Sequence, residues 1–340
     1  MAISSGRRSG GGSLRGIELT PEDPVSELVA LGARAEREGF DTLFASSHYN
    51  NRDPFTVLSQ IAAETENIRL GPGVVNPYET HPVTLASQVA TIHEASDGRG
   101  VFGLGAGDRS TLQNLGIDRD RPLRRVLETM KVSQRLWDGE RVTHDGTFVA
   151  EDAGLNYGVG EIPVYVGAQG PHMLRMSAKH ADGALVNASH PRDFEWADER
   201  ISEGLADRPD HRGEFDFAAF ASVSIAEDGD EAREAARPPV AFIAGGAAKP
   251  VLDRHGIDHE RADEIGEKIG AGEFSAAFEL VTPEMIDAFC IAGTPETVGE
   301  RIDAVLDYAD SFVAGSPLGP NRKEAIRLVA LALDQQCRES

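Results

Sequence analysis

The stretch NIRLGPGVVNPYETHPVTLASQVATIHEASDGRGVFGLGAG (67–107) contains one full repeat of the pattern that decides the fold. A strand-like run (67–75) is followed by a segment with helical spacing of apolar residues (81–96) and by a second strand-like run (98–107). A strand, a helix and a second strand in this order are typical of a parallel sheet with its helices packed on the outside.

The same alternation extends along the chain from residue 14 onward. Strand-like runs are found at 14–20, 41–47, 67–75, 98–107, 162–168, 183–189, 215–226 and 310–316. Helix-like segments follow them, so the sequence predicts eight βα units and an α/β fold of the closed (β/α)8 TIM-barrel type. A doubly wound open sheet is the structural alternative.

We expect residues 14–340 to form a single barrel domain, because barrels of this kind commonly occupy 250 residues or more. Two insertions are predicted, one near 139–160 with a hairpin centred on Asp145 and Gly146, and one near 240–285 that is mostly helical. Residues 1–13 have the composition of a disordered leader, and no apolar segment of a signal peptide follows the Arg pair at 7–8.

The charge balance is strongly acidic. The chain carries 56 acidic and 33 basic residues, for a formal net charge of −23, and only five of the basic residues are Lys. This composition favours a halophilic protein whose assembly depends on salt, and it argues against a nucleic-acid partner. The sequence contains no run of eighteen apolar residues, so we expect a cytoplasmic protein without a membrane partner.

The predicted strands end in polar and glycine-rich residues, and the carboxyl ends of barrel strands form the functional face. Two of these ends, Gly105-Ala106-Gly107-Asp108 and Gly167-Ala168-Gln169-Gly170-Pro171, resemble anion-binding loops at helix N-termini. The alternative interpretation is an ordinary tight turn at each loop. Cys290, Cys337 and the histidines show no metal-ligand spacing, so no metal site is predicted.

At SSHYNNRDPF, LGPGVVNPYETHPVTLASQ, GLGAGD, VYVGAQGPHM and FVAGSPLGP the chain resembles the luciferase-like barrel superfamily. Within that superfamily it is similar to the deazaflavin-dependent methylenetetrahydromethanopterin reductases, over about residues 14–333. The resemblance implies coenzyme F420 as cofactor, a pterin one-carbon carrier as substrate, and a homo-oligomer such as a dimer or tetramer.

The resemblance also assigns residues to the cofactor. Gly73 and Val74 would be joined by a non-prolyl cis peptide bond behind the deazaflavin, with Ser46, His48 and Asn76 at its edge. Ser47 stands where many relatives have Asp, which puts one polar contact in doubt. The loops named above would hold the phosphate and side chain; they comprise Gly105, Ala106, Gly107, Gly167, Ala168, Gln169, Gly170 and Pro171.

For the reaction, the resemblance makes Glu18 the proton donor that opens the imidazolidine ring of the carrier before hydride transfer. Asp108 would be a second pocket carboxylate that holds Glu18 protonated, and a helix N-cap is the competing interpretation of Asp108.

Three rival functions stay open at this point: a monooxygenase or reductase that uses flavin mononucleotide (FMN), another F420-dependent dehydrogenase, and a barrel that binds without catalysis. The residues do not distinguish a methanopterin carrier from a folate carrier.

Overall fold

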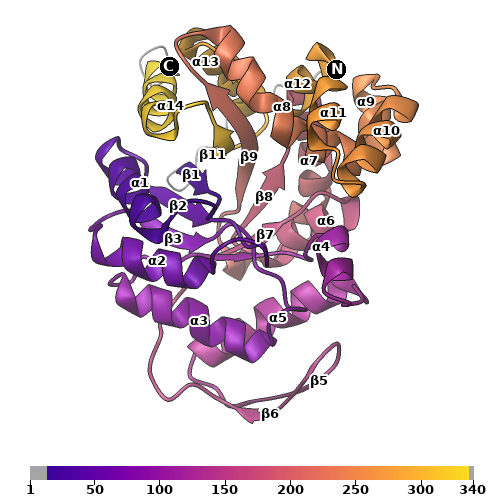
Figure 1. The fold of residues 1–340 in the computed structure, drawn as a ribbon. Coiled ribbons are helices and arrows are strands. Elements are labelled where there is room, and N and C mark those ends of the chain that lie inside the picture. The colour runs from indigo at the N-terminus through magenta and orange to yellow at the C-terminus, as the bar shows by residue number, and fades with distance from the viewer. Residues whose placement is uncertain (1–13, 337–340) are drawn as a thin grey trace. The chain divides into compact units, whose positions relative to one another are not determined.

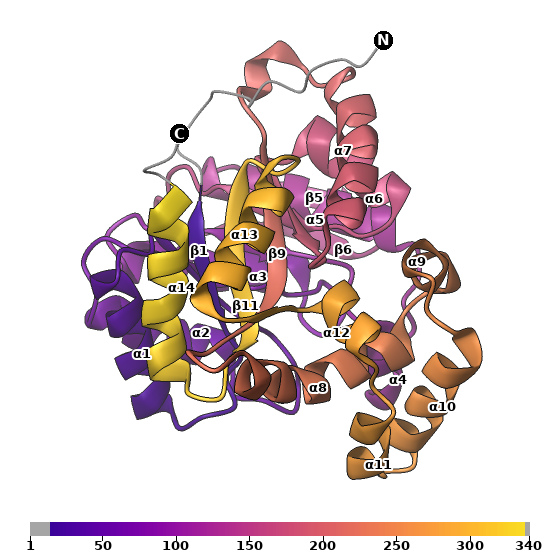
Figure 2. The ribbon, with the colours of Figure 1, turned by 90° about the horizontal axis from the view of Figure 1, so that it is seen from above.

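The computed structural model describes residues 14–336, and the predicted leader at 1–13 lies outside the described residues. The chain divides into two compact units, drawn together in Figures 1 and 2. Among the described residues, the N-terminal unit comprises 14–186 and 197–218, and the C-terminal unit comprises 187–196 and 219–336.

The strands that the N-terminal unit contributes to the large sheet are parallel and follow one another in chain order. They are β1 (Arg15–Leu19), β2 (Thr42–Ala45), β3 (Arg69–Pro72), β4 (Phe102–Leu104), β7 (Val164–Gly167) and β8 (Gly183–Asn187). β1 pairs with β2, β2 with β3, β4 with β7 and β7 with β8, while isolated bridges from Leu70 to Gly100 and from Val75 to Leu104 join β3 to β4. The strand order of a doubly wound sheet reverses at a switch point, so this unbroken order agrees with the predicted barrel instead.

Helices connect these strands and pack on one another in sequence. They are α1 (Val25–Arg37), α2 (Pro54–Ala63), α3 (Pro82–Ala95), α5 (Pro122–Trp137) and α6 (Pro171–His180), in contact as α1–α2–α3–α5–α6. The apolar faces of α3 and α5 meet β4 in one buried cluster, where Phe102 and Trp137 pack edge to face at 5.7 Å. The indole N–H of Trp137 donates to the carbonyl of Ala86 at 3.0 Å, so its one polar atom is paired inside the core.

The helix expected after Asp108 is the short helix α4 (Arg109–Asn114), which is separate from the long helix α5. It forms because Asp108 caps it: the carboxylate accepts the backbone N–H of Thr111 at 2.8 Å. The stretch 139–160 forms an antiparallel hairpin of β5 (Val142–Asp145) and β6 (Val149–Ala153), which is visible next to α5 in Figure 1.

The remaining elements begin with α7 (Pro191–Leu205), the single-turn helix η1 (Asp210–Arg212) and β9 (Asp216–Ile225). In the C-terminal unit β9 pairs with β10 (Ile291–Gly293) and lies next to β11 (Ser311–Leu318). β10 was not predicted, because its three residues lie inside a stretch that otherwise has a helical pattern. The helices are α8 (Gly229–Gly246), α9 (Lys249–His255), α10 (His259–Gly270), α11 (Phe274–Glu279), α12 (Pro283–Phe289), α13 (Pro295–Leu306) and α14 (Arg322–Gln336).

α8 and α10 cross at a pair of glycines. A Cβ on Gly245 would lie 2.9 Å from the Cα of Gly266, and a Cβ on Gly266 would lie 2.8 Å from the carbonyl oxygen of Gly245. Figure 2 shows α10 and α11 beside α8, and the three helices share a core that includes Ile265 and Ala277. The absence of side chains at the crossing therefore sets the distance between α8 and α10.

We expect Gly245→Ala to destabilise the protein by about 1–3 kcal/mol, because the new methyl group meets backbone that cannot rotate away. Gly246→Ala is the matched control, since nothing lies within 4 Å of its added Cβ and alanine is the better helix former. Urea unfolding of both variants measures the difference. Equal free energies of unfolding for the two variants would show that the crossing has room for a side chain.

Glu128 of α5 holds the β5–β6 hairpin in place. Its Oε2 accepts the backbone N–H and the hydroxyl of Thr147, both at 2.7 Å, and lies 3.1 Å from Nε2 of His144, while Oε1 accepts Nε of Arg124 at 2.6 Å. Burial by itself would raise the pKa of Glu128, but the hydrogen bonds from Thr147, Arg124 and His144 outweigh it and lower the pKa to about 2.

Because the folded pKa of Glu128 is lowered, its stabilisation is present above the unfolded pKa of 4.5 and is lost as pH falls toward about 2. We therefore expect wild type to exceed Glu128→Gln in free energy of unfolding at pH 7, with a difference that shrinks between pH 5 and pH 3. Urea titrations across that range measure it. Glu64→Gln, at an exposed position after α2, is the control with little expected effect, and a pH-independent difference at Glu128 would contradict this account.

Candidate functional site

Val74 brings the ends of three strands of the N-terminal unit together. A Cβ on Gly105, just after β4, would lie 3.1 Å from Cγ2 of Val74, and a Cβ on Gly167, the last residue of β7, would lie 2.9 Å from its Cγ1. Any larger residue at either position would collide with Val74. The valine side chain therefore lies against two strand ends that are 62 residues apart in the chain.

The other predicted strand ends join this group. Gly73 packs on the backbone of Ser46, with a Cβ position 3.3 Å from its Cα, and Gly107 packs on the side chain of Asn76 at 3.1 Å. Gly107 has a φ of 72°, a left-handed conformation that glycine adopts without strain. The structure thus brings the predicted residues after β2, β3, β4 and β7 to one end of the sheet.

The peptide bond between Gly73 and Val74 departs from the expectation. Among the described residues the cis peptide bond is Ser316–Pro317, so the bond from Gly73 to Val74 is trans. A cis bond before a residue other than proline costs about 3–4 kcal/mol, and the trans form is therefore the one that ordinary backbone geometry favours. Because Gly73 has no side chain, it allows the end of β3 to pack closely on the segment after β2.

Glu18 is buried at the end of β1 with only 2% of its surface exposed. Its Oε1 accepts the hydroxyl of Ser46 at 2.5 Å and the hydroxyl of Thr20 at 2.9 Å. A carboxyl group in such a place is costly unless it is hydrogen-bonded, and the two hydroxyls also fix its direction. Ser46, predicted at the edge of the cofactor, is thus also a direct partner of Glu18.

Asp108 is the N-cap of α4 and is exposed to solvent. Burial by itself would raise the pKa of Asp108, but hydrogen bonds from Ser110 and Thr111 outweigh it and hold the pKa below its usual value. The carboxylate is therefore charged at neutral pH, as the capping interpretation requires.

Each of the two glycine loops is followed by a helix, and the two helices differ in their N-caps. Asp108 already occupies an N–H of the first turn of α4, whereas the N-cap of α6 is Gly170, which makes no side-chain cap. The first-turn N–H groups of a helix have no partner within the helix, so those of α6 stay open to an anion. Gln169, Gly170 and Pro171 are exposed there, while Ala168 is buried and its N–H donates to Leu185.

Two arginines near these loops form hydrogen bonds with other residues of the protein. Arg175 of α6 pairs with Glu203, which occupies its Nε. Arg119 was missed from the sequence: its Nη1 donates to the carbonyl of Gly107 at 2.8 Å, and its Nε is buried without a hydrogen-bond partner among the described residues. Nothing in the local pattern links Arg119 to a glycine twelve residues earlier, because the contact depends on how the chain returns after α4.

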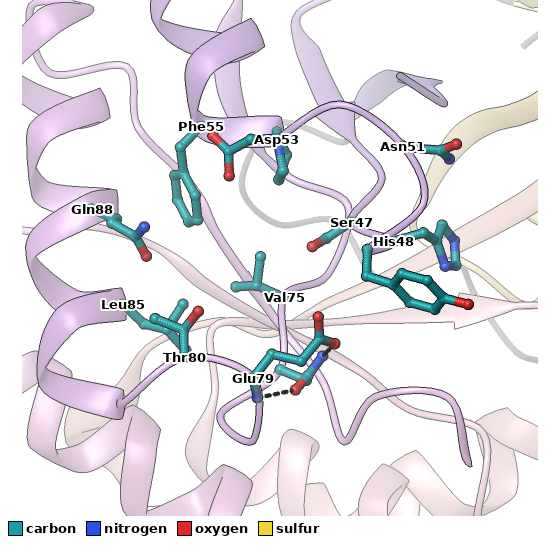
Figure 3. Close-up of a pocket in the computed structure, with 13 residues that line it drawn as sticks. Ser47, His48, Asn51, Asp53, Phe55, Val75, Glu79, Thr80, Leu85 and Gln88 are labelled. Carbon is teal, nitrogen blue, oxygen red and sulfur yellow. Dashed lines mark hydrogen bonds between the residues drawn. The ribbon is translucent and has the colours of Figure 1, made fainter. Parts of the chain in front are cut away.

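A cavity of about 210 Å³, which we call the α2–α3 pocket, opens beside these strand ends in the N-terminal unit (Figure 3). It is lined from the segment after β2, the start of α2, the segment after β3, and α3. Its lining residues are Ser47, His48, Tyr49, Asn51, Asp53, Pro54, Phe55, Val75, Asn76, Glu79, Thr80, Leu85 and Gln88.

Ser47, His48 and Asn76 of this pocket were predicted as cofactor residues, and the others were missed. Asn76 is nearly buried; its Oδ1 accepts the N–H groups of Tyr78 and Glu79, and its Nδ2 donates to Oε1 of Glu79 at 2.5 Å. Gln88 had a signal in the sequence: it follows Leu85 by three residues, so it is a polar residue beside the buried face of α3.

The described residues show no group of three His, Cys, Asp or Glu side chains placed to hold a metal ion. None of the helices between residues 14 and 336 is long and apolar enough to cross a membrane.

Comparisons with known proteins identify the fold and the family. A 5,10-methylenetetrahydromethanopterin reductase from Archaeoglobus fulgidus is 43% identical over 92% of this chain and 96% of its own length. A protein of the same name from Methanolobus tindarius is 41% identical over 92% and 97%. The structure of the coenzyme F420 dependent tetrahydromethanopterin reductase from Methanopyrus kandleri superposes with a TM-score of 0.89 at 38% identity, over 96% of this chain and 99% of that one.

These matches confirm the predicted (β/α)8 barrel of the luciferase-like type. The sequence profile described as luciferase-like monooxygenase matches residues 4–313, nearly the whole chain. The chain belongs to the luciferase-like monooxygenase family.

Proposed function

We propose that this protein is a coenzyme F420-dependent reductase that transfers a hydride from the reduced deazaflavin to the methylene group of a tetrahydropterin one-carbon carrier, giving the methyl form. The observation that carries this is the relation to reductases of that name at 41–43% identity over nearly the whole chain. The carrier would be methylenetetrahydromethanopterin or methylenetetrahydrofolate.

The strand ends of the N-terminal unit fit a flat cofactor with a phosphate. Gly105 and Gly167 pack closely against Val74, and Gly107 packs against Asn76, so these three positions add no side chain to this end of the sheet. The uncapped first turn of α6, with Gly170 as its N-cap, suits the phosphate better than α4, whose N-terminus is already occupied by Asp108. When bound, the reduced deazaflavin supplies the hydride.

Glu18 is our candidate for the proton donor. The ring of the carrier must open to an iminium ion before it can accept a hydride, and this requires a proton at one of its nitrogens. Ser46 and Thr20 both donate to Oε1 of Glu18 and hold the group at the end of β1. Asp108 is charged and is committed to the start of α4 as its N-cap.

The acidic composition is the basis for a proposal about where the protein works and how it assembles. We propose a cytoplasmic protein of a salt-rich cell that forms a homo-oligomer, since molar salt screens the repulsion among 56 carboxylates and so permits close association.

The first test of the proposal is a binding titration in molar KCl with F420 and, separately, with FMN. We expect F420 to bind, and its reduced form to be oxidised on addition of methylenetetrahydromethanopterin or methylenetetrahydrofolate, as absorbance will show. Binding of FMN alone would favour the monooxygenase-type function. Binding of F420 with oxidation only by an alcohol or a sugar phosphate would favour another dehydrogenase, and binding without turnover would favour a non-catalytic barrel.

The second test is Glu18→Gln, which keeps the shape of the side chain and removes the acid. We expect kcat to fall by about 10²–10⁴-fold, the usual contribution of a positioned general acid, with F420 affinity nearly unchanged. Glu27→Gln, the same change at an exposed position on α1, is the control. A Glu18→Gln enzyme with near-wild-type kcat would rule out the proton-donor role.

A further inference from the structure

Arg119 and Arg125, which we call the arginine pair, bond to backbone carbonyls and to no carboxylate in the part of the chain that the structure describes. Arg119 donates from Nη1 to the carbonyl of Gly107 at 2.8 Å. Arg125 donates from Nε to the carbonyl of Pro77 at 2.9 Å and from Nη1 to that of Thr147 at 2.5 Å. A carbonyl oxygen accepts a hydrogen bond without neutralising the cation, so both guanidinium groups keep a charge that attracts an anion.

The arginines between these two positions are neutralised by carboxylates. Arg121 pairs with Asp120 at 2.7 Å, and Arg124 pairs with Glu128 at 2.6 Å. Carboxylates are in excess in this chain, with 56 acidic and 33 basic residues. A pair of arginines anchored to carbonyls in such a protein therefore marks a place where an anion from outside the chain can bind.

Each member of the arginine pair has an N–H₂ group that is open to solvent. Both side chains are half-buried, and Nη2 of each forms no hydrogen bond with the described residues. Nε of Arg119 is buried and unpaired, whereas the two Nη2 atoms do not belong to the buried unpaired atoms. The open groups belong to guanidiniums that the backbone already holds, so little side-chain entropy is lost when they bind a ligand.

The two guanidinium groups lie around one side chain, that of Tyr78. Cζ of Arg125 lies 4.7 Å from the centre of the tyrosine ring. The hydroxyl of Tyr78 donates to the carbonyl of Asp120, the residue after Arg119, at 2.6 Å. Burial raises the pKa of Tyr78, and the nearby charges of Arg125 and Arg119 lower it. A chain with more than one carboxylate can therefore contact both arginines.

The arginine pair is anchored at the end of the sheet that we propose for the cofactor. Arg119 holds the carbonyl of Gly107, whose Cβ position is 3.1 Å from the side chain of Asn76. Arg125 holds the carbonyl of Pro77, the residue after Asn76, and also reaches the β5–β6 hairpin. The pair thus lies beside the strand ends, where the arm of a ligand can reach while its ring stays at the strand ends.

We propose that Arg119 and Arg125 bind the carboxylate arm of a ligand whose ring lies at these strand ends. This rests on the proposed function for the identity of the ligands: F420 carries glutamate beyond its phosphate, and folate and methanopterin carriers also end in carboxylates. We assign the phosphate to the first turn of α6, so the arginine pair is a second and separate anchor. Hydrogen bonds between ions are stronger than neutral ones, and half-buried charges are screened less by salt than exposed ones.

The test compares ligands that differ in the arm. F420 and FO share the deazaflavin and its ribityl chain, but FO lacks the phosphate and the glutamate. Tetrahydrofolate with five glutamates differs from tetrahydrofolate with one only in the length of the arm. We expect Arg119→Gln and Arg125→Gln each to reduce the preference of the full-length protein for the longer arm by about 5- to 10-fold, with FO affinity nearly unchanged. Calorimetric titrations in molar KCl, without air, measure the affinities.

Arg135→Gln is the matched control, because it removes one positive charge from the same helix about 15 Å farther along. Arg135 pairs with Glu140, so we expect its variant to keep the wild-type preferences. Arg125→Lys keeps the charge and should retain part of the preference that Arg125→Gln loses. Thermal unfolding and FO binding verify that each variant folds with its strand ends intact.

The two ligand series identify the source of the arm. Loss of preference confined to F420 over FO would assign the arm to the coenzyme, and loss confined to the longer tetrahydrofolate would assign it to the carrier. Wild-type preferences in both arginine variants would overturn the proposal. An equal loss of FO and F420 affinity would overturn it as well, since the arginines would then only hold the backbone in place.

These readouts separate the arginine pair from the proposed reaction, because none of the titrations needs turnover. Loss of the preference in variants of a protein that does not oxidise reduced F420 would sustain the pair and refute the reaction. An active enzyme whose variants keep the wild-type preferences would sustain the reaction and refute the pair.

Discussion

The close approach of β3 and β4 is the constraint on which the rest of the functional end depends. A Cβ on Gly71 would lie 2.2 Å from the carbonyl oxygen of Val101, and a Cβ on Gly103 would lie 2.0 Å from that of Pro72. Side chains at these positions would force the strands apart and break the bridges at Leu70 and Val75. Because β3 and β4 meet so closely, Val74 reaches the ends of both β4 and β7.

This arrangement separates two kinds of surface at the strand ends. Around Val74 the strand ends carry the glycines Gly105 and Gly167, which pack against its side chain, and this is the end of the sheet that we propose for the cofactor. Behind the same segment, Val75 and Asn76 face helices α2 and α3 and line a small polar pocket. A single short stretch, from Val74 to Asn76, therefore contributes to both surfaces.

The two predicted catalytic carboxyls, Glu18 and Asp108, have different surroundings and therefore different roles. Glu18 is buried with hydroxyl partners from Thr20 and Ser46, and such surroundings allow a carboxyl to be held in a defined direction toward a reacting group. Asp108 is exposed and stabilised as an anion at the start of α4. A carboxyl group therefore acts as a candidate acid in one place and as a structural cap in the other, because hydrogen-bond donors and exposure differ.

The sequence by itself determined the strand and helix order, the barrel and the glycine positions at the strand ends, because these depend on short-range periodicity and on the conformational freedom of glycine. The family motifs added Glu18 and the cofactor. Only the tertiary structure decided that Ser46 bonds to Glu18 across 28 residues, that Arg119 returns to Gly107, and that Gln88 and Glu79 line one pocket. Such pairings depend on which strand ends and helices meet when the core packs, and no local pattern encodes that register.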